Sequence, residues 1–372
     1  MASNYRQSGS DRPSGSDLTI GFVRRGYSSG GAEAYLKRVA AGVAATGRGV
    51  VLFTAADWPA EEWNFGPIVQ LKAKSAIAFA DELENVSREN CDVLLSLERV
   101  WRCDVYRAGD GVHRAWLQRR AEIGGRLQRL SRFFNRKHSA ALALEESLFA
   151  NRRARRVIAN SRMVKEEITR WHGYPADRID VVYNGVPLEL FRDEREPVTT
   201  NEEIVVLFAG SGWERKGLQF AIEAVEAQKG KMKLLVAGRG ETRKFSSSRT
   251  EFLGVVRDMP SLYRSADIFL LPTVYDPFSN ACLEALAAGL PVITTRANGF
   301  SEIIENGRHG TVVDDPRDVG ALSDALRFWS DPTRRQQARA DNRALATQFD
   351  ISVNVAKTLE IITQLAASAA ST

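Results

Sequence analysis

The chain has 372 residues, of which 44% are hydrophobic and 26% are charged. These proportions are those of a globular protein long enough to bury two hydrophobic cores, so a fibrous or wholly disordered chain is excluded. The formal net charge is +5, which favours an anionic ligand or an anionic surface as a partner.

The three cysteines (Cys91, Cys103 and Cys282) are odd in number and show no CxxC spacing. A zinc site or a disulfide framework is therefore not expected, and a reducing compartment fits this pattern. Segment 1–17 is rich in Ser, Gly, Asp and Arg and has no apolar core, which predicts a disordered tail and not a signal peptide. No apolar run approaches the roughly 18 residues that cross a bilayer. We expect a soluble or peripheral protein.

The first half of the chain alternates buried-strand patterns with helical stretches. The strand patterns are LTIGFV (18–23), GVVLFT (49–54), CDVLLSL (91–97) and VIANS (157–161). Gly30 and Gly31 precede an amphipathic helix with Ala34, Leu36 or Tyr35, and Val39 on its inner side. Such a turn suits a phosphate at a helix N-terminus, but an ordinary tight turn explains it equally well. The alternation predicts a parallel, doubly wound sheet over 18–186.

A basic stretch, 112–138, carries eight Arg or Lys residues against one Glu, with apolar and aromatic residues between them. Placed on a helix, it has an apolar stripe beside a cationic face, which suits an anionic membrane surface. The pair Gly124-Gly125 disfavours one unbroken helix. A helix packed on its own domain and a nucleic-acid site are the alternatives. We expect the membrane surface as partner, and no nucleic acid.

A second series of strand patterns follows a polar linker at 193–203. These patterns are IVVLFAGS (204–211), KLLVAGRG (233–240), EFLGVV (251–256), IFLLP (268–272) and PVITT (291–295). Between the first two, WERKG (213–217) is interpreted as a basic loop. The repeat predicts a second Rossmann-like domain at 187–348 that faces the first across a cleft. A final helix in 349–372 is expected to cross back onto the N-terminal domain.

The stretch from Tyr275 to Glu302 is predicted to be the functional centre. It contains a short helix, with Ser279 or Asn280 placed to cap it and Gly289 placed to end it. Two carboxylates, Asp276 and Glu284, bracket the start of this helix. A loop that follows a parallel strand and leads into a helix N-terminus is where open α/β sheets bind anionic ligands.

The charged residues of the second half suit a sugar diphosphate. Arg215 and Lys216 follow a strand directly, and the chain has no DxD pair for a divalent metal. An arginine and a lysine neutralise a diphosphate leaving group instead, although a surface pair that caps a loop is the alternative. Glu284 is placed to accept hydrogen bonds from a ribose diol, and Asp276 from sugar hydroxyls. The helix dipole alone explains one of these acids but not both.

Residues 275–302 resemble the donor-site signature of glycosyltransferase family 4. The E-x7-E motif of that family is present as Asp276-x7-Glu284 and is followed by A-x-A-A-G-x-P-V. Supporting matches are the GGxE turn (Gly30, Gly31, Glu33), YNGV (183–186), RKG (215–217), VAGRG (236–240), FLGVV (252–256) and YRSADIFLLP (263–272). The family consists of retaining enzymes of GT-B fold, so the resemblance implies an α/β protein with two Rossmann-like domains around a nucleotide-sugar cleft.

The resemblance also implies roles for individual residues. Arg215 and Lys216 would bind the donor pyrophosphate, Glu284 the ribose and Asp276 the transferred sugar. The remaining expected contacts are the amides of Phe278, Ser279 and Asn280 near sugar and phosphate, Arg239 and the backbone of Val255 and Val256 near the base, Gly30 and Gly31 lining the cleft, and Asp110 or His113 near the reacting sugar or acceptor. No metal and no cofactor beyond the donor is expected.

Within the family, CDVYRAGDGVHRAWL (103–117) is similar to the lipopolysaccharide core glucosyltransferases. These enzymes transfer glucose from UDP-glucose to a heptose, and a basic region of theirs touches the inner membrane. The similarity implies a glycolipid or lipopolysaccharide acceptor and a cytoplasmic protein, peripheral on the inner face of the cytoplasmic membrane. Asp276 replaces the first Glu of the motif and is one methylene shorter, so UDP-GlcNAc, UDP-galactose and GDP-mannose stay alternative donors.

Two other classes of function fit parts of the sequence. A non-hydrolysing sugar-nucleotide epimerase has the same architecture and would act without an acceptor. A binding module for anionic lipid or nucleic acid would rest on 112–138 alone. A dehydrogenase is disfavoured, because no GxGxxG follows the first strand.

Overall fold

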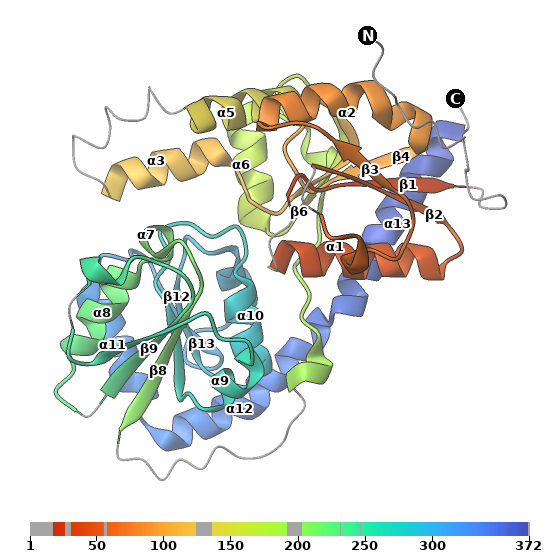
Figure 1. The fold of residues 1–372 in the computed structure, drawn as a ribbon. Helices are drawn as coiled ribbons and strands as arrows, with labels where there is room; N and C mark the ends of the chain where they lie inside the picture. The colour runs from red at the N-terminus through yellow and green to blue at the C-terminus, as the bar shows by residue number, and fades with distance from the viewer. Residues whose placement is uncertain are drawn as a thin grey trace.

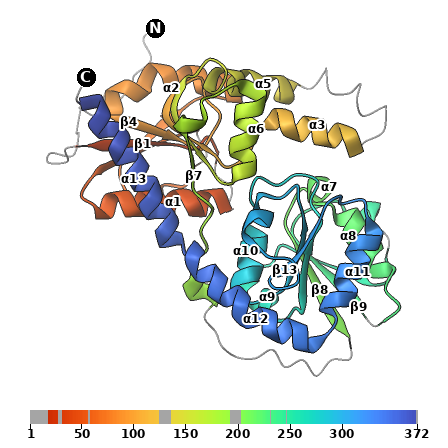
Figure 2. The same ribbon diagram turned by 180° about the vertical axis from the view of Figure 1, so that it is seen from behind.

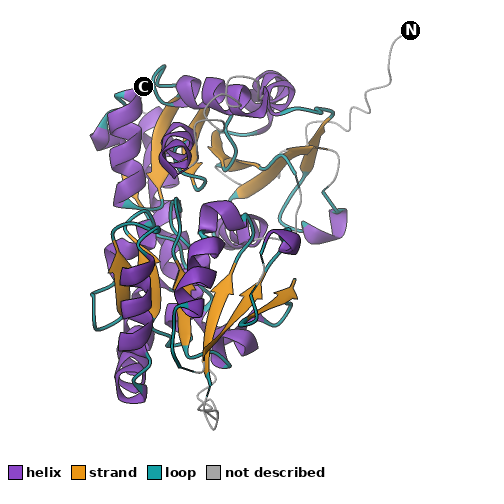
Figure 3. Ribbon diagram, turned by 90° about the vertical axis from the view of Figure 1, so that its left-hand side faces the viewer, coloured by secondary structure: helices purple, strands orange, loops and turns teal. Residues whose placement is uncertain are grey.

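The computed structural model describes residues 18–26, 31–55, 58–123, 136–191, 203–230, 232–245 and 247–370. These residues form two α/β domains, each built on a parallel sheet with helices on its faces (Figure 1). Figure 3 shows the strands of both domains enclosed by helices. The expected tail at 1–17, Gly30 and residues 124–135 of the basic stretch lie outside the described residues.

The sheet of the N-terminal domain has seven described strands in the order β3-β2-β1-β4-β5-β6-β7. They are β1 (Thr19–Val23), β2 (Gly49–Ala55), β3 (Ile68–Leu71), β4 (Val93–Ser96), β5 (Cys103–Ala108), β6 (Ala154–Ala159) and β7 (Ile179–Val181). The helices are α1 (Gly31–Ala45), α2 (Ala76–Asn90), α3 (His113–Ile123), α5 (Arg136–Leu148) and α6 (Arg162–His172), with short 3-10 turns at Ala60–Glu62, Ala176–Arg178 and Leu188–Phe191. The strand order reverses between β1 and β4, and ligands of open α/β sheets bind at such a point.

The sheet of the C-terminal domain has six described strands in the order β10-β9-β8-β11-β12-β13. They are β8 (Ile204–Ala209), β9 (Met232–Ala237), β10 (Thr250–Gly254), β11 (Ile268–Leu271), β12 (Val292–Thr295) and β13 (Gly310–Val313). The helices are α7 (Trp213–Lys216), α8 (Leu218–Glu226), α9 (Met259–Arg264), α10 (Asn280–Ala287), α11 (Val319–Trp329), α12 (Pro332–Ala346) and α13 (Ile351–Ala370), with 3-10 turns at Thr242–Lys244, Gly299–Ile303 and Thr347–Phe349.

The buried strands explain why the hydrophobic runs are continuous. All residues of β1, β4 and β5 are buried, because helices cover both faces of a parallel sheet. Every strand pattern that the sequence predicts lies on a strand. The patterns do not predict β3, β5 or β13. Of these, β3 and β13 are four residues each and carry several half-exposed positions, whereas β5 is fully buried.

The C-terminal helix crosses back to the N-terminal domain, as expected (Figure 2). Ile362 of α13 is fully buried in the hydrophobic cluster that contains α1. At the crossing, the Val186 amide donates to the Phe349 carbonyl at 2.9 Å, and the Ile351 amide donates to the Val186 carbonyl at 3.0 Å. A Cβ on Gly185 would lie 2.6 Å from the Cα of Ile351, so this close approach of two backbones requires glycine.

Segments 213–217 and 112–138 differ in how far their local structure follows the sequence prediction. WERKG is not a loop: residues 213–216 form the one-turn helix α7 between Gly212 and Gly217. The basic stretch is helical in α3, and α5 begins at Arg136, but the residues between them are not described. Across the described residues, no helix is both long and apolar enough to span a membrane.

Candidate functional site

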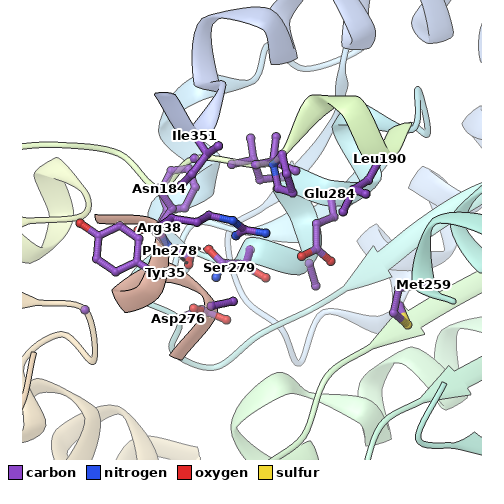
Figure 4. Close-up of a pocket in the computed structure, with 18 of the residues that line it drawn as sticks. Tyr35, Arg38, Asn184, Leu190, Met259, Asp276, Phe278, Ser279, Glu284 and Ile351 are labelled. Carbon is purple, nitrogen blue, oxygen red and sulfur yellow. Dashed lines mark hydrogen bonds between the residues drawn. The ribbon is translucent and has the colours of Figure 1, made fainter. Parts of the chain in front are cut away.

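A cavity of about 670 Å³ lies between the two domains. Its N-terminal wall comes from α1 and from the ends of β1, β4 and β5, and its C-terminal wall from the β11–α10 loop and α10 (Figure 4). The segment that crosses between the domains, including Asn184, lines it as well. The two switch points of the strand order therefore face one cavity.

The N-terminus of α10 points into this cavity. Ser279 caps the helix, because its Oγ accepts the Cys282 amide at 3.3 Å. Asn298 holds the cap in place, since its Oδ1 accepts the Ser279 amide at 3.1 Å. Ser279, Asn280 and Ala281 all line the cavity. Free amides and the helix dipole make such a terminus an anion site.

A buried ion pair stands beside this helix terminus. Lys216 Nζ lies 2.6 Å from Asp276 Oδ2, and the two residues are 9% and 5% exposed. Removing one member of such a pair leaves a buried charge without a partner and costs about 3–5 kcal/mol. The pair holds the Asp276 carboxylate in one position at the cavity wall.

Glu284 lies one turn into α10 and also lines the cavity. The Tyr263 hydroxyl donates to its Oε2 at 2.9 Å. Burial raises the pKa of Glu284, and the Tyr263 hydroxyl and the nearby charge of Arg38 lower it. In the described part of the chain, its Oε1 accepts no hydrogen bond, so this oxygen is available to a ligand hydroxyl.

Three arginines form the opposite wall. Arg24 follows β1 and is paired with Glu33 and Glu98, each at 2.9 Å. Arg107 on β5 is 3% exposed, donates to Asn184 Oδ1 at 2.6 Å, and has no carboxylate partner among the described residues.

Arg38 on α1 points across the cavity toward Ser279 and Glu284 (Figure 4). It makes no hydrogen bond or ion pair within the ranges that the structure describes. Together with Lys216 and Arg257, these arginines exceed the lining carboxylates Asp110, Asp276 and Glu284 by two positive charges. This excess suits a dianion such as a sugar-nucleotide diphosphate.

Two family models match the chain. The model of "Glycosyl transferases group 1" matches residues 203–330, and that of "Glycosyltransferase Family 4" matches residues 29–190. A probable transglycosylase of Burkholderia thailandensis is 32% identical over 294 residues, which cover 75% of each chain. This protein is a glycosyltransferase of group 1/family 4.

Two further relatives differ in the share of their length that is matched. The lipopolysaccharide glucosyltransferase WaaG of Escherichia coli is 25% identical over 366 residues, which cover 90% of this chain and 95% of that protein. An uncharacterized glycosyltransferase of Methanocaldococcus jannaschii is 32% identical over 177 residues, and the chain spans only 45% of its length. This glycosyltransferase is therefore similar along almost its whole length to the lipopolysaccharide glucosyltransferase WaaG.

The solved structures show the same fold. The crystal structure of WaaG superimposes with a TM-score of 0.77 at 22% identity, covering 92% of this chain and 99% of that one. Anabaena HepE in complex with UDP and glucose has a TM-score of 0.69 at 18% identity, covering 93% and 99%. The glycosyltransferase thus has the GT-B architecture that the sequence predicts.

The cavity of this glycosyltransferase collects most of the residues that the sequence singles out. Those that line it are Asp110, Lys216, Asp276, Phe278, Ser279, Asn280 and Glu284. Asp110 follows β5 and is exposed, with 70% of its side chain accessible. Gly31 is the first residue of α1, and Gly30 lies outside the described residues.

The other expected site residues that the structure describes, Gly31 and Val255 among them, are not part of this lining. Arg215 donates to the Tyr275 carbonyl at 3.0 Å and lines a second cavity, beside Trp116 and Trp213. The His113 ring is hydrogen-bonded to His138 at 3.0 Å, and burial together with the charge of Arg99 lowers the pKa of His113 to about 4. Arg239 contacts Ser211 through its amide, and Val256 is absent from the lining. Their predicted contacts with the donor or the acceptor are not tested by this lining and stay predictions.

The arginines of the N-terminal wall are the residues that sequence reasoning missed. One signal was present for Arg38: it follows Ala34 by four residues, so both lie on the same face of α1. That face turns toward the cavity, since Ala34 and Arg38 both line it. The described residues contain no cluster of three or more His, Cys, Asp or Glu side chains that would hold a metal.

Proposed function

We propose that this glycosyltransferase moves a hexose, glucose from UDP-glucose, onto a lipopolysaccharide core or another glycolipid, with retention of the anomeric configuration and without a metal. The observation that carries the proposal is the cavity itself. An open carboxylate oxygen of Glu284, a helix N-terminus and the Lys216–Asp276 pair share one wall, and arginines face them from the other domain. Similarity to an Escherichia coli lipopolysaccharide glucosyltransferase supports the sugar and the acceptor.

The donor would bind mainly to the C-terminal wall. Glu284 Oε1 accepts the ribose hydroxyls, and the amides at the start of α10 contact the diphosphate. Lys216 and the arginines of the N-terminal wall supply the positive charge that a diphosphate requires. Arg215 contributes indirectly, because its guanidinium holds the backbone carbonyl of Tyr275.

The transferred sugar would lie between Asp276 and Asp110. Asp276 accepts hydrogen bonds from the sugar hydroxyls while Lys216 holds its carboxylate in place. Aspartate is one methylene shorter than the glutamate of the family motif. A hexose therefore sits closer to the backbone of the β11–α10 loop than it would beside glutamate.

In the reaction, the bond between the anomeric carbon and the diphosphate oxygen breaks, and UDP leaves with the electron pair. The acceptor hydroxyl attacks the anomeric carbon on the same face, and its proton passes to the departing phosphate. Negative charge grows on the diphosphate in the transition state. Preorganised cations at that position stabilise it, and removal of one such group typically costs about 100- to 1,000-fold in rate.

The acceptor would be presented at an anionic membrane surface on the cytoplasmic side. Two arginines of α3 are already paired within the protein, Arg119 with Glu167 at 2.9 Å and Arg120 with Glu214 at 3.0 Å. Flotation with vesicles that contain anionic lipid, across a salt series, tests this part of the proposal.

The central experiment is a panel of UDP-glucose, UDP-GlcNAc, UDP-galactose and GDP-mannose, measured by thermal shift and then by transfer to a truncated lipopolysaccharide. We expect UDP-glucose to raise the melting temperature most, because a ligand that binds only the folded state stabilises it. The product should be the α-anomer by NMR, and EDTA should leave the rate unchanged. No thermal shift with any of the four nucleotide sugars would overturn the proposal, and epimerised nucleotide without acceptor would favour an epimerase.

A further inference from the structure

Tyr275, the residue directly before Asp276, is embedded in the other domain. It belongs to the C-terminal domain by sequence, yet it is 1% exposed and packs in the hydrophobic cluster of the N-terminal domain. Trp116 of α3 stacks on its ring with centroids 6.4 Å apart. Arg119, also on α3, places its guanidinium 5.3 Å from the centroid of the Tyr275 ring.

The Tyr275 hydroxyl makes two hydrogen bonds to the N-terminal domain. It donates to Glu167 Oε2 at 2.8 Å and accepts the Val112 amide at 2.9 Å. Glu167 is itself held by Arg119 at 2.9 Å. These groups are buried, so each bond lost leaves a buried polar atom without a partner and weakens the anchor.

Gly111 shapes the pocket for this hydroxyl. A Cβ at this position would lie 2.3 Å from the Tyr275 hydroxyl oxygen, and Gly111 has φ +67. The pocket therefore accepts the tyrosine only because residue 111 has no side chain.

We propose that Tyr275 is a positioning residue, which sets the Asp276 carboxylate by anchoring its loop to the N-terminal domain. Asp276 directly follows the anchored Tyr275 in the chain, and its amide donates to the Ala297 carbonyl at 2.9 Å. The β11–α10 loop is thus bound to the N-terminal domain at Tyr275 and to the C-terminal domain at Asp276. Lys216 fixes the Asp276 carboxylate within the C-terminal domain, and the Tyr275 anchor fixes the position of that carboxylate relative to the N-terminal wall and Asp110. This inference rests on the proposed role of Asp276 in holding the transferred sugar.

The test compares Tyr275→Phe with two matched tyrosine variants. Tyr183→Phe removes another hydrogen bond between the domains, to Glu302 at 3.1 Å, and Tyr174→Phe removes one within the N-terminal domain, to Ala154 at 2.9 Å. We expect Tyr275→Phe to lower kcat about 10- to 100-fold, since small misplacements of a reacting group cost that much. The Kd for UDP should change less than about 2-fold, because Tyr275 does not line the cavity. Both control variants should keep kcat within about 3-fold of wild type.

A second pair of variants does not depend on the stability of Tyr275→Phe. Gly111→Ala and Gly173→Ala both place a side chain at positive φ, +67 and +62, but a Cβ on Gly173 meets no atom within 4 Å. Only Gly111→Ala should lower kcat beyond its effect on the melting temperature. In a Tyr275→Phe background this additional loss should shrink but not vanish, because the hydroxyl at 2.3 Å is gone while Pro277 Cγ stays 2.7 Å from the added Cβ.

Asp276→Asn separates the inference from the function on which it rests. If Asp276→Asn loses turnover while Tyr275→Phe keeps wild-type kcat, the positioning role is wrong and the proposed function stands. If Asp276→Asn turns over normally, both are wrong. A fall in kcat for Tyr183→Phe equal to that for Tyr275→Phe would also overturn the positioning role, because docking in general would then explain it.

Discussion

The two walls of the cavity are built in different ways. The C-terminal wall comes mostly from one continuous stretch, 275–302, and its groups are tied to each other, as in the pair of Lys216 with Asp276. The N-terminal wall takes Arg24, Arg38 and Arg107 from three separate elements. Arg38 makes no bond, and Arg107 has no carboxylate partner, in the part of the chain that the structure describes. One wall is preorganised, and the other has charge that a ligand would neutralise.

Among variants of the two walls, Lys216→Met should lower kcat the most. It removes a cation from the cavity and leaves the Asp276 carboxylate buried without its partner, so we expect kcat to fall about 100- to 1,000-fold. The control is Lys37→Met, because Lys37 pairs with Glu62 at the same 2.6 Å distance but near the surface. That variant should keep its kcat and lose less than about 1 kcal/mol of stability. Equal losses in the two variants would remove the distinction between a preorganised pair and an ordinary one.

Glu284→Gln should raise the Kd for UDP about 10- to 100-fold, which is what hydrogen bonds to a charged group usually contribute. The comparison ligand is 2′-deoxy-UDP, measured by calorimetry. If Glu284 accepts the ribose hydroxyls, the variant and the missing hydroxyl remove the same interaction, and their effects should not add. Additive losses would place the carboxylate away from the ribose.

Arg38→Gln tests the other wall. We expect about 10-fold weaker binding of UDP and unchanged binding of uridine, because an arginine that faces a phosphate contributes only when the phosphate is present. Arg48→Gln is the control, since Arg48 lies just after α1, away from the cavity lining, and its guanidinium donates to Thr46 at 2.8 Å. A loss of uridine affinity that matches the loss of UDP affinity would contradict a phosphate contact.

The smallest expected effect is that of His113 on how stability depends on pH. Burial and the charge of Arg99 lower the pKa of His113 to about 4 from an ordinary 6.5. Between these values the unfolded chain binds more protons than the folded protein, so stability falls as the pH drops from 6.5 toward 4. The melting temperature of His113→Asn should fall less than that of wild type over this interval. An identical pH profile for the two proteins would show that His113 does not contribute.

The sequence predicts the fold well because the signals for it are local. Continuous apolar runs mark the buried strands, and of the two predicted capping residues, Ser279 and Asn280, Ser279 is the one that caps α10. The carboxylates Asp276 and Glu284 lie on this same local unit, so their approach to one cavity follows from strand, loop and helix alone. The final helix is also expected to cross back onto the N-terminal domain, and the structure confirms it.

The sequence by itself determined most of the buried strands, the start of α10 and the two acids beside it, since these depend on neighbours along the chain. Only the tertiary structure decided which cations share the cavity with them. Residues 215 and 216 lie on the one-turn helix α7, where consecutive side chains point roughly 100° apart. Lys216 therefore enters the cavity, whereas Arg215 turns to the Tyr275 carbonyl. Arg38 and Arg107 reach the same place from α1 and β5, because domain docking brings together residues that no local pattern relates.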